Sequence, residues 1–151
     1  MKRFNDAKAL LNELYDKTQS HIYLHQLGMV AREAGDYIEA LNMFEHECSM
    51  LTTNDHLGKA ANMYEQALVN DLLGNQDVAS KLATLCLALS LSTEDNIMHG
   101  CAYRLMGDLF RKNSFEKAKM YYRNSLEAFE KAKDNIACNE IKERLNSLNK
   151  C

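Results

Sequence analysis

The chain has 151 residues, enough for one domain with a substantial core, and 18 Lys and Arg against 21 Asp and Glu give a formal charge of −3. It contains no proline and only six glycines, which argues against proline-rich linkers and collagen-like segments. Leu and Ala far outnumber Val and Ile, which favours helices over pleated sheets. We therefore predict an all-α fold. The chain has no run of basic residues, so we expect neither nucleic acid nor a membrane as its partner.

Apolar residues recur at helical spacing along almost the whole chain, and short polar segments interrupt them. This pattern predicts eight helices, at residues 2–16, 20–34, 37–51, 55–73, 76–91, 95–112, 115–132 and 134–149. Gly35, Gly74 and Asn113 are expected to close the first helix of each pair. Asp36 and Glu39 are expected to form a capping box at the start of the following helix.

The first and last helices differ from the others. Helix 2–16 carries apolar side chains such as Phe4 and Leu10 but has no preceding partner, so it either caps one end or continues into another segment. Helix 134–149 is mostly polar, as expected of a terminal cap. We expect a single domain over residues 1–151, made of an N-terminal helix (1–16), helix pairs 20–51, 55–91 and 95–132, and a capping helix (134–149).

A short pattern, an aromatic residue followed three positions later by alanine, recurs along the chain. Its alanines include Ala40, Ala79 and Ala118, which are each 39 residues apart. One helical turn further on lies Phe44, Ala83 or Tyr122, on the same helix face. Upstream, the small residues Gly28, Ala67 and Gly107 recur at similar spacing and would let two helices approach closely. The chain is therefore predicted to consist of repeated helix pairs.

These positions resemble the signature of the tetratricopeptide repeat. The residues that match it are Leu27, Gly28, Gly35, Tyr37, Ala40 and Phe44 in one copy, Ala67, Gly74 and Ala79 in a degenerate copy, and Gly107, Phe115, Ala118 and Tyr122 in a third. The copies are 39 to 40 residues apart, against about 34 in the usual repeat, and lack the proline that often ends one. Such long repeats resemble those of bacterial peptide-sensing regulators and kinesin light chains. The resemblance implies a right-handed α-solenoid of about three and a half helix-turn-helix repeats.

Stacked helix pairs form a concave face lined by the first helix of each pair, and such grooves receive peptides. Counting from the small-residue register places nine candidate binding residues on this face: His25, Met29, Arg32, Tyr64, Leu68, Asp71, Arg104, Asp108 and Arg111. Arg104 and Arg111 are expected to meet carboxylates, and Met29, Tyr64 and Leu68 to contact apolar side chains. Chaperone-binding members of the family hold a carboxylate with an asparagine where this chain has Met29, Leu68 and Asp108, so that clamp is absent here.

Catalytic and metal-binding patterns are weak. His21 and His25 have a spacing that can hold zinc, but Ile22 stands where the usual motif has glutamate, and no third ligand lies nearby. Cys86 and Cys101 lie among apolar residues, as buried structural cysteines do. We expect no metal, no cofactor and no enzyme activity. The five cysteines are odd in number and form no Cys-x-x-Cys pair, which predicts reduced thiols and a cytoplasmic location.

The sequence therefore predicts a non-catalytic protein- or peptide-binding module that uses its concave groove, in a signalling or regulatory adaptor. One alternative is a self-associating scaffold, a fragment of a larger solenoid, that forms a homodimer through the N-terminal helix. A second alternative is a metal-dependent enzyme built on the histidines or cysteines.

Overall fold

The structure is a computed structural model, and it describes residues 1–150. Eight α-helices make up all the regular structure of these residues. They are α1 (Lys2–Thr18), α2 (His21–Ala34), α3 (Tyr37–Met50), α4 (His56–Leu72), α5 (Gln76–Leu91), α6 (Asn96–Phe110), α7 (Phe115–Lys131) and α8 (Asn135–Leu148). Their ends differ from the predicted ranges by at most two residues. The predicted all-α fold with eight helices is therefore confirmed.

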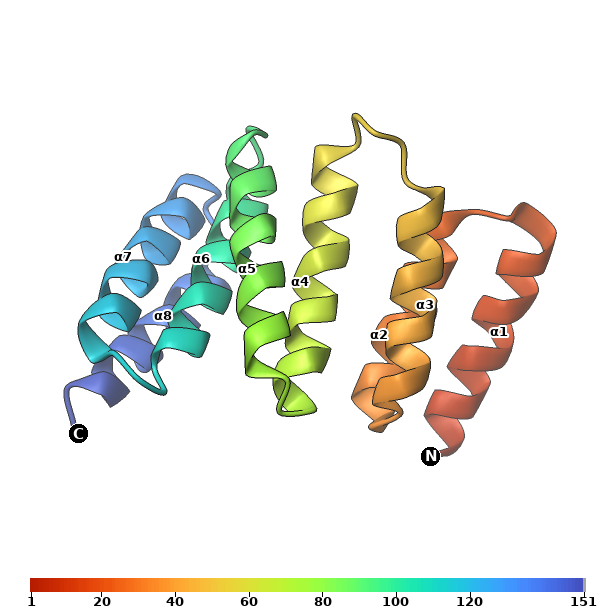
Figure 1. Cartoon of the computed structure of the whole chain (residues 1–151), viewed down its shortest axis with the longest axis horizontal. Helices are drawn as coiled ribbons and strands as arrows, with labels where there is room; N and C mark the ends of the chain where they lie inside the picture. Colours follow the sequence, from red (N-terminus) through yellow and green to blue (C-terminus); the bar gives the residue numbers. More distant parts are fainter. Residues whose placement is uncertain (151) are drawn as a thin grey trace.

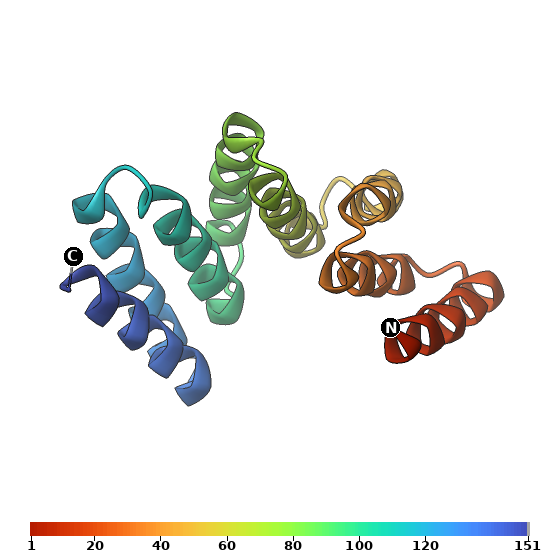
Figure 2. The ribbon, with the colours of Figure 1, turned by 90° about the horizontal axis from the view of Figure 1, so that it is seen from below.

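The helix pairs follow one another in chain order, with the two termini at opposite ends of the molecule (Figure 1). Seen along the other direction, the row bends into an arc whose ends are α1 and α8 (Figure 2). Each helix packs on the next in sequence, and α4 also contacts α2 and α6. This arrangement is that of a helical-repeat solenoid, in which each unit contacts mainly its neighbours.

The apolar core is divided into small clusters between neighbouring helices. Ala31, Ala40, Phe44 and Val69 form one cluster at the junction of α2, α3 and α4. A separate cluster centred on Tyr122, Phe129 and Ile141 joins α7 to α8. No large central core exists among the described residues, so stability comes from the interfaces between successive helices.

The small residues of the repeat register pack against the large residue of the next helix. A Cβ atom added to Gly28 would lie 2.5 Å from the ring of Phe44, and one added to Gly107 would lie 2.5 Å from the ring of Tyr122. In the middle repeat, both positions are alanine, and these two residues belong to one buried cluster: Ala67 and Ala83. Glycine thus faces an aromatic ring, whereas alanine faces alanine, so the helix pairs fill comparable space with different residues.

The turns within helix pairs follow the prediction in part. Gly35 and Gly74 have φ angles of 86° and 82°, the left-handed conformation that glycine adopts without strain. Asn113 does not adopt it, and the Ser114 amide instead donates to the carbonyl of Phe110. The predicted closure of this turn by a left-handed residue is therefore wrong.

The predicted capping box at α3 is also wrong. The Asp36 side chain makes no hydrogen bond with the helix it precedes. Glu39 faces α1 instead, where its carboxylate lies 2.6 Å from the ammonium of Lys8. The competing ion pair removes the glutamate that the box requires.

Three aspartates between the pairs do cap the following helices. The side chains of Asp55, Asp95 and Asp134 each accept a hydrogen bond from the backbone N–H three residues on, at 2.7, 2.7 and 3.0 Å. Each precedes the first helix of a unit or, for Asp134, the terminal helix α8. The starts of α4, α6 and α8 are thus all fixed by the same kind of side-chain cap.

The two terminal helices are buried to different degrees. No residue of α1 is fully buried, and Leu10 is 57% exposed. Helix α8 buries Ala137, Cys138, Ile141 and Leu148 and presents a polar outer face. No helix formed by residues 1–150 combines the length and apolar character needed to cross a membrane.

Candidate functional site

The candidate groove residues lie on α2, α4 and α6, except Arg111, which directly follows α6. Side-chain contacts join these helices to one another and to α8. Arg32 of α2 contacts Glu65 of α4, with 2.9 Å between Nε and Oε2. Tyr64 of α4 contacts Arg104 of α6. The four helices therefore form one continuous row, which we call the concave row, across the inside of the arc (Figure 2).

Arg104 holds the centre of the concave row together. Its guanidinium donates to the hydroxyl of Tyr64 at 2.9 Å and pairs with the carboxylate of Glu140 in α8 at 3.2 Å. It also lies 5.8 Å from the centre of the Phe129 ring, within the range of a cation–π interaction. Burial raises the pKa of the Tyr64 hydroxyl against the opposing effect of Arg104, so this group stays neutral. Arg104 is a bridge within the molecule, and its contact with a ligand stays a prediction.

Asp108 lies one turn further along α6, and Arg111 is the residue directly after its last turn. The carboxylate of Asp108 accepts hydrogen bonds from the Tyr122 hydroxyl at 2.6 Å and from Nε of Arg144 at 3.0 Å. Arg111 is exposed and donates to the hydroxyl of Ser147 at 3.0 Å, and no carboxylate within residues 1–150 pairs with it. Of the two predicted carboxylate-binding arginines, Arg111 is thus the accessible one.

Asp71, near the end of α4, already interacts with neighbouring side chains. Its Oδ1 atom lies 2.5 Å from the Lys112 ammonium and accepts a hydrogen bond from Gln76 at 2.7 Å. The apolar members of the candidate set differ in exposure: Met29 is 37% exposed, whereas Leu68 packs against the cluster around Ala67. Met29 and Arg111 therefore offer the most accessible surface of the nine residues.

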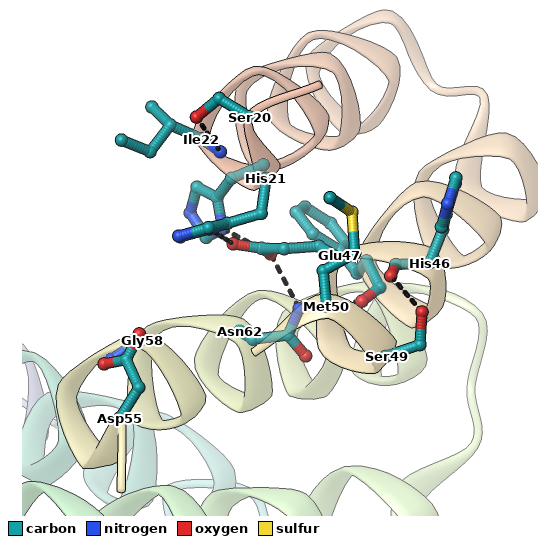
Figure 3. Close-up of polar contacts among 12 residues, drawn as sticks. Ser20, His21, Ile22, His46, Glu47, Ser49, Met50, Asp55, Gly58 and Asn62 are labelled. Atoms are coloured by element: carbon teal, nitrogen blue, oxygen red, sulfur yellow. Dashed lines mark hydrogen bonds and ion pairs between the residues drawn. The ribbon is translucent and has the colours of Figure 1, made fainter. Parts of the chain in front are cut away.

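A buried carboxylate joins the first repeat to the second. Glu47 of α3 has a side chain only 4% exposed, and three polar groups surround it (Figure 3). Nδ1 of His25 lies 2.9 Å from one oxygen, and Nδ1 of His21 lies 3.4 Å from the other. The amide of Asn62 in α4 donates to Glu47 and to the carbonyl of Phe44, both at 2.7 Å. We call His21, His25, Glu47 and Asn62 the Glu47 cluster.

Within the Glu47 cluster, burial and nearby charges shift the pKa of His25. Burial by itself would lower the pKa of His25, but the hydrogen bond and charge of Glu47 and the charge of Glu65 outweigh it, so the pKa is raised above 6.5. Burial raises the pKa of Glu65, and the nearby Arg32 opposes that effect. The carboxylate of Glu47 thus favours the protonated form of His25.

The structure places the cysteines and histidines singled out in the sequence in different surroundings. Burial raises the pKa of the Cys86 thiol to about 12, so it does not form a nucleophilic thiolate near neutral pH. Within residues 1–150, no three His, Cys, Asp or Glu side chains are placed to hold a metal ion. His46 packs its ring edge-on against Tyr15, away from the histidines of α2.

Several residues that build the concave row were missing from the sequence-based set. The sequence places Glu140 and Arg144 only in a polar capping helix, yet they pair with Arg104 and Asp108 of the concave row. In the structure, three pairs join α6 and its C-cap residue Arg111 to α8, and each pair connects residues 36 positions apart. Glu47 gave no signal in the sequence, because an isolated glutamate on a helix is usually exposed.

No protein-family model matches the chain, and no curated protein matches its sequence. Among solved structures, the chain is similar to BtubC (BKLC) from P. vanneervenii, with a TM-score of 0.74 and 17% sequence identity. The match covers 97% of this chain and 63% of BtubC, so the chain spans less than two thirds of the length of that protein. The likeness shows the fold, an all-α superhelix of the tetratricopeptide type.

Proposed function

We propose that this chain is a single non-catalytic tetratricopeptide-repeat domain that binds a peptide segment of a partner protein on its concave row. In that role it would serve as a signalling or regulatory adaptor. The observation that carries the proposal is the unbroken series of contacts from α2 through α4 and α6 to α8. A surface held in this way is preorganised, so a peptide binds it without the cost of ordering the side chains first.

The accessible groups of the concave row suit an extended or helical peptide with mixed character. Met29 offers exposed apolar surface, and Arg111 offers a guanidinium without a paired carboxylate in residues 1–150. The side chains of Arg104 and Asp108 are held in place by hydrogen bonds to Tyr64 and Arg144. We expect a partner segment that places an acidic group near Arg111 and an apolar side chain near Met29.

The test compares capture of partners by three forms of the protein. Wild type, the variant Met29→Glu/Arg111→Glu and the control Arg123→Glu are immobilised, exposed to lysate of the source cells, and the bound proteins are quantified by mass spectrometry. Arg123 is an exposed arginine of α7, outside the concave row. We expect a partner that wild type and Arg123→Glu retain and that Met29→Glu/Arg111→Glu loses at least tenfold, about 1.4 kcal/mol. Equal capture by all three forms would contradict the proposal.

A second candidate function, self-association through α1, rests on the exposure of Phe4 and Leu10 and on the absence of buried residues in that helix. Light scattering of the whole chain and of Phe4→Glu/Leu10→Glu distinguishes it. A dimer that the double substitution dissociates supports this function, whereas a monomeric wild type rules it out.

A further inference from the structure

A second surface, separate from the concave row, lies between α5 and α6. A small cavity of about 70 Å³ opens there, several times the volume that one water molecule needs. Its lining combines apolar side chains of α6, two hydroxyls of α5 and one amide from the turn after α6. These residues are Ser80, Thr84, Met106, Leu109, Phe110 and Asn113. None of these residues is a candidate of the concave row. We call this site the α5–α6 pocket.

The pocket continues onto an exposed apolar face of α5. A shallow depression shares Ser80 and Thr84 with the pocket and extends over Lys81 and Leu85. Leu85 is 51% exposed, and α5 carries no charge from Leu82 to its end. The exposed Leu85 therefore extends the apolar lining of the pocket onto the surface, where one partner segment can contact both.

The charges around the pocket select the chemistry of that partner. Lys81 stands on the depression, and the Lys117 ammonium lies 5.0 Å from the centre of the Phe110 ring that lines the pocket. Neither lysine forms an ion pair with another group of residues 1–150, although Asp77 and Glu116 lie in the first turns of the same helices. The rim is therefore an apolar recess flanked by two available cations.

We propose that the α5–α6 pocket docks an acidic amphipathic segment of a partner protein. One aliphatic side chain of the segment enters the cavity beside Met106 and Phe110. The carboxylates of the segment pair with Lys81 and Lys117. A second copy of this chain fits the site less well, because a two-fold contact through this face would bring the same lysines toward each other. The proposal does not depend on the concave row, and either site can fail without the other.

The test uses two synthetic fluorescent helical peptides with the same leucine pattern, one carrying glutamates and the other lysines at the remaining positions. We expect saturable binding of the acidic peptide alone, measured by fluorescence anisotropy, and weaker binding at high salt. Lys81→Glu/Lys117→Glu should lower its affinity at least tenfold. Thr84→Met, which fills the cavity from an exposed position, should also weaken it. The control Lys2→Glu/Arg3→Glu makes the same change of charge on exposed residues of α1, at the N-terminal end of the arc, and should leave affinity unchanged.

Three results would overturn the proposal. The first is no saturable binding of the acidic peptide, or equal binding of both peptides. The second is binding that survives Lys81→Glu/Lys117→Glu and is lost in Arg111→Glu, which places the peptide on the concave row. The third is a wild-type dimer that Leu85→Glu dissociates in sedimentation experiments, which assigns the surface to a second copy.

Discussion

At the scale of single residues, the repeats are fitted together by matched volumes. Gly28 and Gly107 leave room for the rings of Phe44 and Tyr122, and the middle repeat uses alanine on both sides. Glycine weakens a helix by about 1 kcal/mol relative to alanine, so its presence in α2 and α6 needs such a reason. The reason here is steric.

We predict that Gly28→Ala destabilises the protein by about 1–2 kcal/mol, because overpacking against Phe44 exceeds the gain in helix propensity. Adding Phe44→Leu to that variant should cost less than it costs in wild type, since the smaller side chain relieves the contact. Urea unfolding of the four proteins gives the free energies. A Gly28→Ala variant more stable than wild type would show that the contact is not limiting.

At the scale of helices, an aspartate at the N-cap does not act in the same way at every helix. Asp95 caps α6 through its side chain, whereas Asp36 precedes α3 without a hydrogen bond to it. Asp95→Ala should therefore lower the free energy of unfolding by about 1 kcal/mol, and Asp36→Ala should change it by much less. Thermal or urea unfolding of the two variants checks the difference, and equal losses would contradict it.

The Glu47 cluster joins three helices and makes their packing sensitive to pH. The pKa of His25 is higher in the folded chain than in the unfolded one, so folding takes up protons at this group. Its stabilising contribution is complete below about pH 6.5 and disappears as the pH rises through the folded pKa.

We predict that the free energy of unfolding falls as the pH rises from about 6.5 through the pKa of His25 in the folded chain. His25→Gln should reduce this fall, because glutamine can still donate to Glu47 but does not titrate. The other histidines are retained in the variant and serve as the internal control. Identical pH dependence of wild type and His25→Gln would exclude the cluster as its source.

At the scale of the whole molecule, the repeat register predicted the architecture well. Small residues, alanines and aromatics recur at one spacing, and that spacing alone places the helix pairs in order. Interactions between side chains were harder to predict. Glu39 has the spacing that a capping box requires. It pairs instead with Lys8 of α1, which lies 31 positions earlier in the sequence. Arg104 suits a ligand contact by its register, but Tyr64 and Glu140 already occupy its guanidinium.

These differences have one physical origin. Helix periodicity is a local property that neighbouring residues determine, whereas the partner of a charged side chain depends on which helices become neighbours and how far each is buried. The concave row could be located from sequence, but the division of its residues into fixed bridges and accessible groups required the three-dimensional arrangement.

The central claim is that the concave row binds a peptide segment, and two methionines report on it directly. Met29 of α2 lies on the row, whereas Met120 of α7 is 48% exposed outside it. The measurement is a methyl NMR titration of protein labelled at its methionine methyl groups with a peptide from the captured partner. The proposed function predicts that the Met29 signal shifts saturably while the Met120 signal stays in place. A shift of Met120 without one of Met29 would contradict it.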